Sequence, residues 1–529
     1  MNTLIIDIGT SSMRGILFDE AGEKLAVHQV RYQPDKLPDG RIEQDPEDWT
    51  GSLVAIASKI AFAAKEQETT VDVVAVTAQR SSIIPIDADG KPLMNTLMWQ
   101  DRRNAYLCEE LAPYNDLVFE KSGARLNTVF SGSRMMWIRK NRPDVCEKLY
   151  KFVNIPEYVM HYMTGNYVTD TTYGSRSHLM NLRERRWDPD LLRLFEVKEE
   201  ELCTLQEPGS VVGYTTEAFA EATGLLAGIP VVTAGGDQQC AAIGQGAFRE
   251  GNLSLVAGTG GFLVTAVDEV PEHLSSQLIC NCSSVRGHYM VEANVLTCCS
   301  AFDWYCRTFY DWGVPAEGPK DDIKEDLKDD WEEGEKQAAA DKAAREAAQE
   351  QEAGKIDYDR INRDLAAVDG NVSPALVLPY FQGRSTPEWN PNARALFAGI
   401  SLNTTRTDLL KGLLEGICME IQNNISLFGD YTNIEKAYIS GGLTNSPVIN
   451  QLQADVYGIP LYHMEDSEST ALGALMVTLE GLNVYPSLDA AFEKIRGAAK
   501  AERYEPRATQ HQQYEEKRKE MNALYQSVK

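Results

Sequence analysis

The amino-acid sequence predicts an α/β protein with two duplicated halves. Residues 4–18, LIIDIGTSSMRGILF, and residues 253–267, LSLVAGTGGFLVTAV, share a strand, a hairpin of small residues and a second strand. Helical stretches and a further buried strand, at 71–82 and at 434–446, follow each copy. Strands that alternate with long helices in this way are typical of sheets covered by helices on both faces.

The order of elements follows from the apolar runs and the turn residues between them. Residues 4–8 and 14–18 flank the GTSS turn, and a turn at 19–24 leads to a third strand, which predicts an antiparallel meander. Residues 228–248 predict a strand, a glycine-rich turn and a helix of small residues. We place the domain boundary at the end of this helix, so the expected domains are 1–246 and 247–529.

Charge and composition exclude several classes of protein. The 529 residues contain 51 Lys and Arg against 78 Asp and Glu, a formal net charge of −27 that repels nucleic acid and anionic membranes. The first residues lack a basic stretch, and no apolar run approaches the length of a membrane span. Ten cysteines without a CxxC pair and seven scattered histidines give no disulfide scaffold and no His-based metal site. We expect a cytoplasmic protein with no nucleic-acid or membrane partner.

One segment differs in composition from the rest. Residues 317–352 hold fourteen Asp and Glu against six Lys and Arg, with many alanines. This pattern predicts a solvated helical insertion. A partner-docking arm is the alternative interpretation.

Two carboxylates end apolar strands beside small residues: Asp7 and Asp237. Each one alone also fits a turn or a helix cap. The loops GTSS (9–12) and GTGG (258–261) occupy equivalent places in the two halves, and their amide and hydroxyl groups can cradle phosphate oxygens. The combination predicts two phosphate-binding loops that face each other across a cleft.

Two longer motifs carry a family resemblance. Residues 129–141 read VFSGSRMMWIRKN, and residues 395–415 read ALFAGISLNTTRTDLLKGLLE, in order with GDQQ at 236–239. They resemble the two signatures of the FGGY family of carbohydrate kinases, with Arg134 for the usual Lys and Gly412 for the usual Ala or Ser. The resemblance implies a two-domain actin-like ATPase (ribonuclease H-like) fold with MgATP and a sugar or polyol in one cleft.

The resemblance also implies roles for single residues. Asp237 matches the general base that accepts the hydroxyl proton, and Asp7 matches the carboxylate that holds Mg²⁺, with Asp237 beside it. Three elements would bind ATP. The first phosphate loop matches Thr10, Ser11, Ser12 and Arg14. The second loop matches Gly258, Thr259 and Gly260, and the adenosine motif matches Gly441, Gly442 and Asn445.

The acceptor side resembles the glycerol kinase branch in part. Arg80 and Trp99 match residues that face the polyol, and Gln238 follows the general base. Ser81 and Val129 stand where glycerol kinases have Glu and Tyr. We expect these smaller side chains to leave room in the site, so that it takes a polyol or ketose longer than glycerol. Asp170 is a further candidate for the sugar site, and a turn residue is its alternative interpretation.

Two other functions stay open at this point. An actin-like ATP-binding protein with a regulatory or assembly role, and weak or no kinase activity, would share the fold. A catalytically weak sensor is the other, because Ser81 and Val129 depart from the glycerol kinase pattern. A homodimer is compatible with the sequence. Retention of Asp237 with Gln238 favours the kinase.

Overall fold

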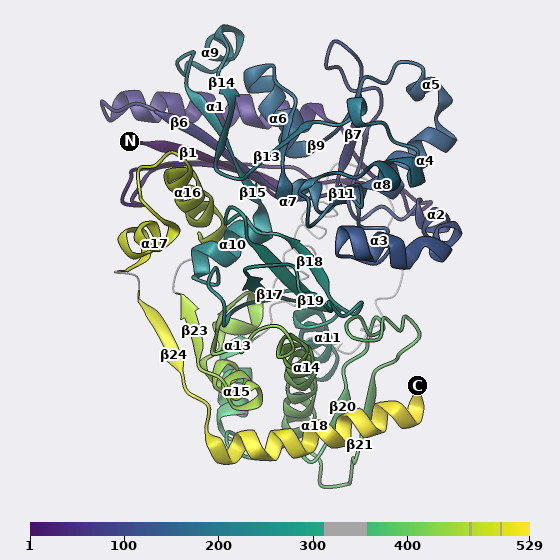
Figure 1. Cartoon of the computed structure of the whole chain (residues 1–529). Helices are drawn as coiled ribbons and strands as arrows, with labels where there is room; N and C mark the ends of the chain where they lie inside the picture. The colour runs from purple at the N-terminus through teal and green to yellow at the C-terminus, as the bar shows by residue number, and fades with distance from the viewer. Residues whose placement is uncertain (311–356, 465–467, 498–499) are drawn as a thin grey trace, which may run out of the picture.

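The computed structural model describes residues 1–310, 357–464, 468–497 and 500–529 (Figure 1). The acidic insertion predicted at 317–352 lies outside these residues. The described part of the chain forms two main sheets, one of six strands and one of seven, with helices around them.

The first half contains the six-stranded sheet, in the order β14-β15-β6-β1-β2-β3, and a smaller five-stranded sheet, β4-β5-β8-β7-β9. Its strands are β1 (Thr3–Ile8), β2 (Ser12–Phe18), β3 (Lys24–Arg31), β4 (Asp35–Lys36), β5 (Ile42–Gln44), β6 (Val73–Ala78), β7 (Ile83–Ile86), β8 (Thr96–Leu97), β9 (Lys151–Asn154), β10 (Val168–Asp170), β11 (Met180–Asn181), β12 (Arg186–Trp187), β13 (Thr204–Gln206), β14 (Ser210–Tyr214) and β15 (Pro230–Gly236). Its helices are α1 (Glu47–Glu66), α2 (Ala105–Glu110), α3 (Asn115–Ser122), α4 (Ser131–Asn141), α5 (Pro143–Cys146), α6 (Ile155–Thr164), α7 (Thr171–Gly174), α8 (Pro189–Leu194), α9 (Glu217–Thr223) and α10 (Asp237–Gln245).

The second half contains the seven-stranded sheet, β18-β19-β17-β16-β22-β23-β24, and the pair β20-β21. Its strands are β16 (Asn252–Ala257), β17 (Gly261–Val267), β18 (Ile279–Cys282), β19 (Tyr289–Val295), β20 (Leu376–Leu378), β21 (Leu396–Ala398), β22 (Lys436–Ser440), β23 (Leu461–Met464) and β24 (Ala501–Tyr504). Its helices are α11 (Cys299–Phe309), α13 (Tyr358–Ala366), α14 (Arg406–Phe428), α15 (Pro447–Tyr457), α16 (Ser469–Gly481), α17 (Leu488–Arg496) and α18 (Ala508–Val528).

The strand directions confirm the predicted duplication. β3, β2 and β1 are antiparallel neighbours, and β6 and β15 continue the sheet in parallel with β1. The series β19, β17, β16, β22 and β23 repeats this order with the same directions. The antiparallel meander predicted for the first thirty residues is therefore correct, and it recurs in the second half.

Helix α16 connects the two halves. It comes from the second half of the chain, but its apolar side chains pack with residues of β1, β2, β6 and β15, such as Ile5, Ile16 and Val232. Helix α10 packs in the same cluster, and Figure 1 shows both helices between the two sheets. The predicted domain boundary at residue 246 would place the two sheets in different domains. Helix α16, from the second domain, would then cover the sheet of the first.

The C-terminal helix α18 runs along the far end of the second half, below α14 and α15 in Figure 1. Its buried residues Tyr514, Met521 and Tyr525 join the core of that half. Within the described residues, no helix is long and apolar enough to cross a membrane.

Candidate active site

The candidate site begins at the carboxyl ends of three neighbouring parallel strands of the first half. Asp7 lies near the end of β1, Gln79 and Arg80 follow β6, and Asp237 follows β15. The register places Asp7, Thr77 and Gly235 in one row across the sheet, and the Thr77 hydroxyl donates to the Gly235 carbonyl at 2.8 Å. Carboxyl ends of parallel strands share one sheet edge, where α/β proteins bind ligands. The structure therefore brings Asp7, Arg80 and Asp237 to the same edge.

The turn that carries Asp237 needs its two glycines. Gly235 has a φ of +99°, in the region that favours glycine. A Cβ on Gly236 would lie 2.7 Å from Cδ of Arg80, so the Arg80 side chain rests on the residue that precedes Asp237. Asp237 is the first residue of α10, and its Oδ1 accepts the Gln238 amide at 2.8 Å. Sequence reasoning therefore located the turn and its carboxylate correctly.

The two carboxylates influence each other electrostatically. Burial, and next the charge of Asp237, raise the pKa of Asp7 to about 7, while Arg14 acts in the opposite direction. Burial raises the pKa of Asp237, against the lowering effect of Arg80 and Arg176. A divalent cation beside such a pair would relieve the repulsion, so the donor set fits Mg²⁺. Two carboxylates are enough for Mg²⁺, because this ion takes few protein ligands and completes its shell with phosphate and water.

The predicted first phosphate loop contacts a residue predicted for the acceptor side. The Gly9 amide donates to the Ser12 carbonyl at 2.9 Å, which closes the hairpin, and Ser11 is exposed. The Trp99 indole N–H donates to the Thr10 hydroxyl at 3.2 Å. Thr10 and Trp99, which were predicted to bind different ligands, are therefore direct neighbours.

Arg14 takes part in an ion pair across the two halves. Its Nη2 lies 2.7 Å from both carboxylate oxygens of Glu468, the residue before α16. Glu468 also contributes to the raised pKa of Asp7. Arg14 is thus held at the border between the halves.

The predicted second phosphate loop lies beside the predicted adenosine motif. Gly258 follows β16 and Gly441 follows β22, its parallel neighbour. Gly441 has a φ of +98°, and a Cβ there would lie 2.4 Å from the Ala257 carbonyl oxygen. Thr259, Gly442 and Asn445 are exposed. The strand ends of the second half therefore bring these two predicted nucleotide elements together.

Asp170 lies behind the Asp237 turn and is fully buried. Its carboxylate accepts the amide of Thr172 at 2.8 Å and the hydroxyls of Thr172 and Thr233. The Thr172 hydroxyl in turn accepts the Gly236 amide at 3.0 Å. These contacts relate Asp170 to the shape of the turn, and Asp170 caps α7 as well.

Sequence reasoning missed Glu292 and Arg176. Glu292, on β19 of the second half, accepts from Arg80 at 3.1 Å and from Arg176 at 3.2 Å. Burial tends to raise the pKa of Glu292, but Arg80 and Arg176 hold it below its usual range. Burial lowers the pKa of Arg176 to about 10, which leaves it charged near neutral pH. A carboxylate within the apolar strand YMVEANV was the available signal, because buried charges need partners.

Sequence reasoning also missed the structural role of Arg134, which lies in the first signature motif. It is fully buried, and its guanidinium donates to the carbonyls of Val129 at 2.8 Å, Ser81 at 3.3 Å and Trp99. Arg134 therefore fixes the three loops that surround the predicted acceptor site.

Ser81 and Val129 differ in exposure. Ser81 is buried with a φ of +75°, and its hydroxyl donates to the Arg176 carbonyl at 3.3 Å. Its small side chain thus leaves no space open to solvent at that point, in contrast to the expectation from sequence. Val129, by contrast, is half-buried.

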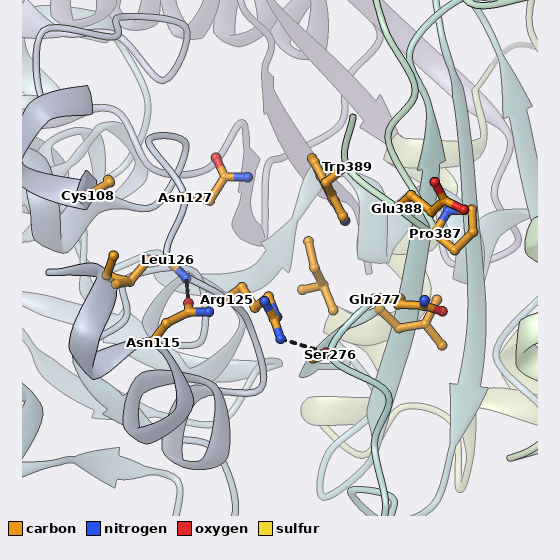
Figure 2. Close-up of a pocket in the computed structure, with 13 residues that line it drawn as sticks. Cys108, Asn115, Arg125, Leu126, Asn127, Ser276, Gln277, Pro387, Glu388 and Trp389 are labelled. Atoms are coloured by element: carbon orange, nitrogen blue, oxygen red, sulfur yellow. Dashed lines mark hydrogen bonds between the residues drawn. The ribbon is translucent and has the colours of Figure 1, made fainter. Parts of the chain in front are cut away.

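A cavity of about 670 Å³ lies between the two halves, lined by Arg125, Asn127, Ser276 and Trp389 among others. Figure 2 shows the Arg125 guanidinium reaching Ser276, to whose hydroxyl it donates at 2.9 Å. None of the predicted site residues lines this cavity.

Comparisons with known proteins agree with this arrangement. The chain is 29% identical over 508 residues to a glycerol kinase of Thermococcus onnurineus, a match that spans 94% of this chain and 92% of the relative. Gluconate kinase of Lactobacillus acidophilus (TM-score 0.84, 20% identity) and Plasmodium falciparum glycerol kinase with ADP (TM-score 0.83, 21% identity) share the fold. In both cases the match covers 100% of this chain and 98% of the other. The N-terminal domain model of the FGGY carbohydrate kinases matches residues 2–244, and the C-terminal domain model matches residues 253–480. The chain therefore belongs to the FGGY family of carbohydrate kinases.

Proposed function

We propose that this kinase transfers the γ-phosphoryl group of ATP to a hydroxyl of an uncharged polyol or ketose, with Asp237 as the proton acceptor. The observation that carries the proposal is the shared sheet edge, where Arg80 lies between the strand ends that bear Asp7 and Asp237. Phosphoryl transfer requires positioning, charge neutralisation and a carboxylate near the attacking hydroxyl, and this edge supplies candidates for each.

The protein groups would divide the work as follows. Asp237 accepts the proton of the attacking hydroxyl, and its raised pKa makes it a stronger base than an ordinary aspartate. Asp7, with Asp237 near it, would hold Mg²⁺, which neutralises phosphate charge when bound. The amides and hydroxyls of the loops 9–12 and 258–261 would orient the phosphates. Gly441, Gly442 and Asn445 are proposed to contact the adenosine.

We propose that Arg80, Trp99 and Gln238 bind the acceptor. Asp170 supports the turn behind them. Arg80 offers several fixed donors to neighbouring hydroxyls, and Trp99 offers an apolar wall to a carbon chain. Val129, where glycerol kinases carry Tyr, supports an acceptor longer than glycerol. The names of the sequence relatives favour glycerol itself, which is the second candidate.

The test is ADP production with a panel of acceptors: glycerol, C4 to C6 polyols, ketopentoses, ketohexoses and sugar acids. We expect at least tenfold higher kcat/KM with a longer neutral acceptor than with glycerol. Glycerol as the best acceptor would support the second candidate. ATP binding without acceptor-dependent ADP production would support the actin-like regulatory alternative.

All ten cysteines are free thiols, which supports a reducing, cytoplasmic setting.

A further inference from the structure

Glu292 is a residue of the second half that binds two arginines of the first half. Its Oε1 accepts from Nη1 of Arg80 at 3.1 Å, and its Oε2 accepts from Nη1 of Arg176 at 3.2 Å. The three side chains are only 9 to 13% exposed. One carboxylate thus uses both oxygens to hold both arginines.

Each arginine is also fixed from its other side. The Arg80 side chain rests on Gly236, beside Asp237. The Arg176 guanidinium lies 4.6 Å from the centre of the Phe130 ring, and its backbone carbonyl accepts from Ser81. Glu292 completes the set, so the arginines have one defined position each.

The charges of this group balance. Arg80 and Arg176 contribute two positive charges, and Glu292 and Asp237 contribute two negative charges when ionised. A carboxylate ligand is bound best by a guanidinium that is free to form a paired contact. Here each arginine donates one hydrogen bond from Nη1 to Glu292, so the carboxylate of Glu292 already offsets charge that a carboxylate ligand would otherwise meet.

We propose that Glu292 positions Arg80 and Arg176 beside Asp237 and compensates their charge, so that the acceptor site takes an uncharged polyol or ketose and rejects a sugar acid. This inference rests on the proposed function, because it assumes that Arg80 and Asp237 face the acceptor. It goes further by assigning the choice of substrate class to a residue of the opposite half. The acceptor site is then complete only when both halves contribute.

The variant Glu292→Gln keeps the size of the side chain and removes its charge. The site would gain one uncompensated positive charge, which a sugar acid can use and a polyol cannot. We expect the KM for a neutral acceptor to rise at least tenfold, while the KM for ATP stays within twofold. We also expect kcat/KM for the acid, relative to the neutral acceptor, to rise at least tenfold.

The probes are matched pairs of equal carbon chain: glycerol and glycerate, xylitol and xylonate, sorbitol and gluconate. The pair is chosen whose neutral member the unaltered enzyme uses best. Glu207→Gln is the matched control, because Glu207 pairs with Arg185 through two hydrogen bonds outside the candidate site. This control should change neither the KM values nor the acid-to-neutral ratio.

The outcomes separate the inference from the proposed function. If the unaltered enzyme uses its neutral acceptor and Glu292→Gln leaves the acid-to-neutral ratio unchanged, Glu292 does not set the substrate class and the kinase proposal stands. A preference of the unaltered enzyme for the acid member overturns the inference at once. If the enzyme uses no acceptor, the proposed function fails and this inference fails with it.

A second variant covers the case in which Glu292→Gln does not fold. Glu292→Asp keeps the charge and shortens the reach by one methylene. Loss of position should raise the acceptor KM at least threefold with the ATP KM unchanged and the acid-to-neutral ratio close to that of the unaltered enzyme. An unchanged acceptor KM, or equal increases for acceptor and ATP, would overturn the positioning role.

Discussion

Gly244 of α10 and Gly473 of α16 face each other where the two helices cross between the halves. A Cβ on Gly473 would lie 1.8 Å from the Cys240 carbonyl oxygen, and one on Gly244 would lie 1.9 Å from that of Ser469. The helix that begins with Asp237 is therefore in backbone contact with a helix of the second half. This contact couples the position of the candidate base to the packing of both halves.

The crossing predicts that Gly473→Ala destabilises the protein. The added methyl group meets backbone, which cannot move aside as a side chain can, so we expect a loss of about 1–3 kcal/mol or more. Urea unfolding of both proteins measures this loss of unfolding free energy. Gly51→Ala in α1 is the control, because a Cβ there meets nothing within 4 Å and the better helix propensity of Ala should leave stability equal or higher. Equal effects of the two substitutions would contradict the close crossing.

A second prediction concerns the helix α18, which follows the region matched by the family model. Glu415 of α14 is fully buried and pairs with Lys517 of α18 at 2.5 Å, and it also accepts the Ser373 amide at 3.0 Å. Breaking a buried pair leaves an uncompensated charge, so Glu415→Gln should cost about 3–5 kcal/mol of unfolding free energy.

The matched control for that pair lies on the same helix. Glu515 and Arg518 form a partly exposed pair at 2.7 Å. Glu515→Gln should change the unfolding free energy by no more than about 1 kcal/mol, because surface pairs contribute little. A loss of similar size in both variants would show that α18 is not anchored through Glu415.

A third prediction concerns the response to acid. Burial lowers the pKa of His178 to about 3, and its ring is stacked on Phe130 at 3.9 Å. The unfolded state, with a pKa near 6.5, then binds more protons than the folded state, so stability is lost as pH falls below about 6.5. His178→Phe removes this dependence.

The measurement is the unfolding free energy of both proteins between pH 7 and pH 4.5. We expect the unaltered protein to lose about 2–3 kcal/mol relative to His178→Phe over this range. A difference that stays constant with pH would show that His178 titrates normally in the folded protein.

Local pattern was sufficient to predict the strand ends of the site. Apolar runs before Asp7 and Asp237 predict the strands, and the glycines beside Asp237 predict the turn. All of these signals lie within a few residues of the structure that they predict. The duplication was visible for the same reason, because each copy is a short contiguous hairpin.

Contacts between distant segments were not predictable in this way. The sequence ALGALMVTL of α16 indicates a buried helix, but it does not indicate that the covering sheet belongs to the other half. Glu292 and Arg176 are separated by 116 residues, and their pairing depends on how the halves meet. The hydrogen bond from the Ser81 hydroxyl to the Arg176 carbonyl likewise joins residues 95 positions apart in the sequence.

The central claim is that Asp237 accepts the proton of the attacking hydroxyl, and Asp237→Asn tests it most directly. The amide keeps the size of the side chain and removes the basic oxygen. Removal of a general base costs about 10²- to 10⁴-fold in rate, or roughly 3–5.5 kcal/mol of barrier. Steady-state turnover with the best acceptor should fall at least 100-fold, while ADP binding by calorimetry stays within threefold. Retention of more than about a tenth of the turnover, with the chemical step limiting, would contradict the claim.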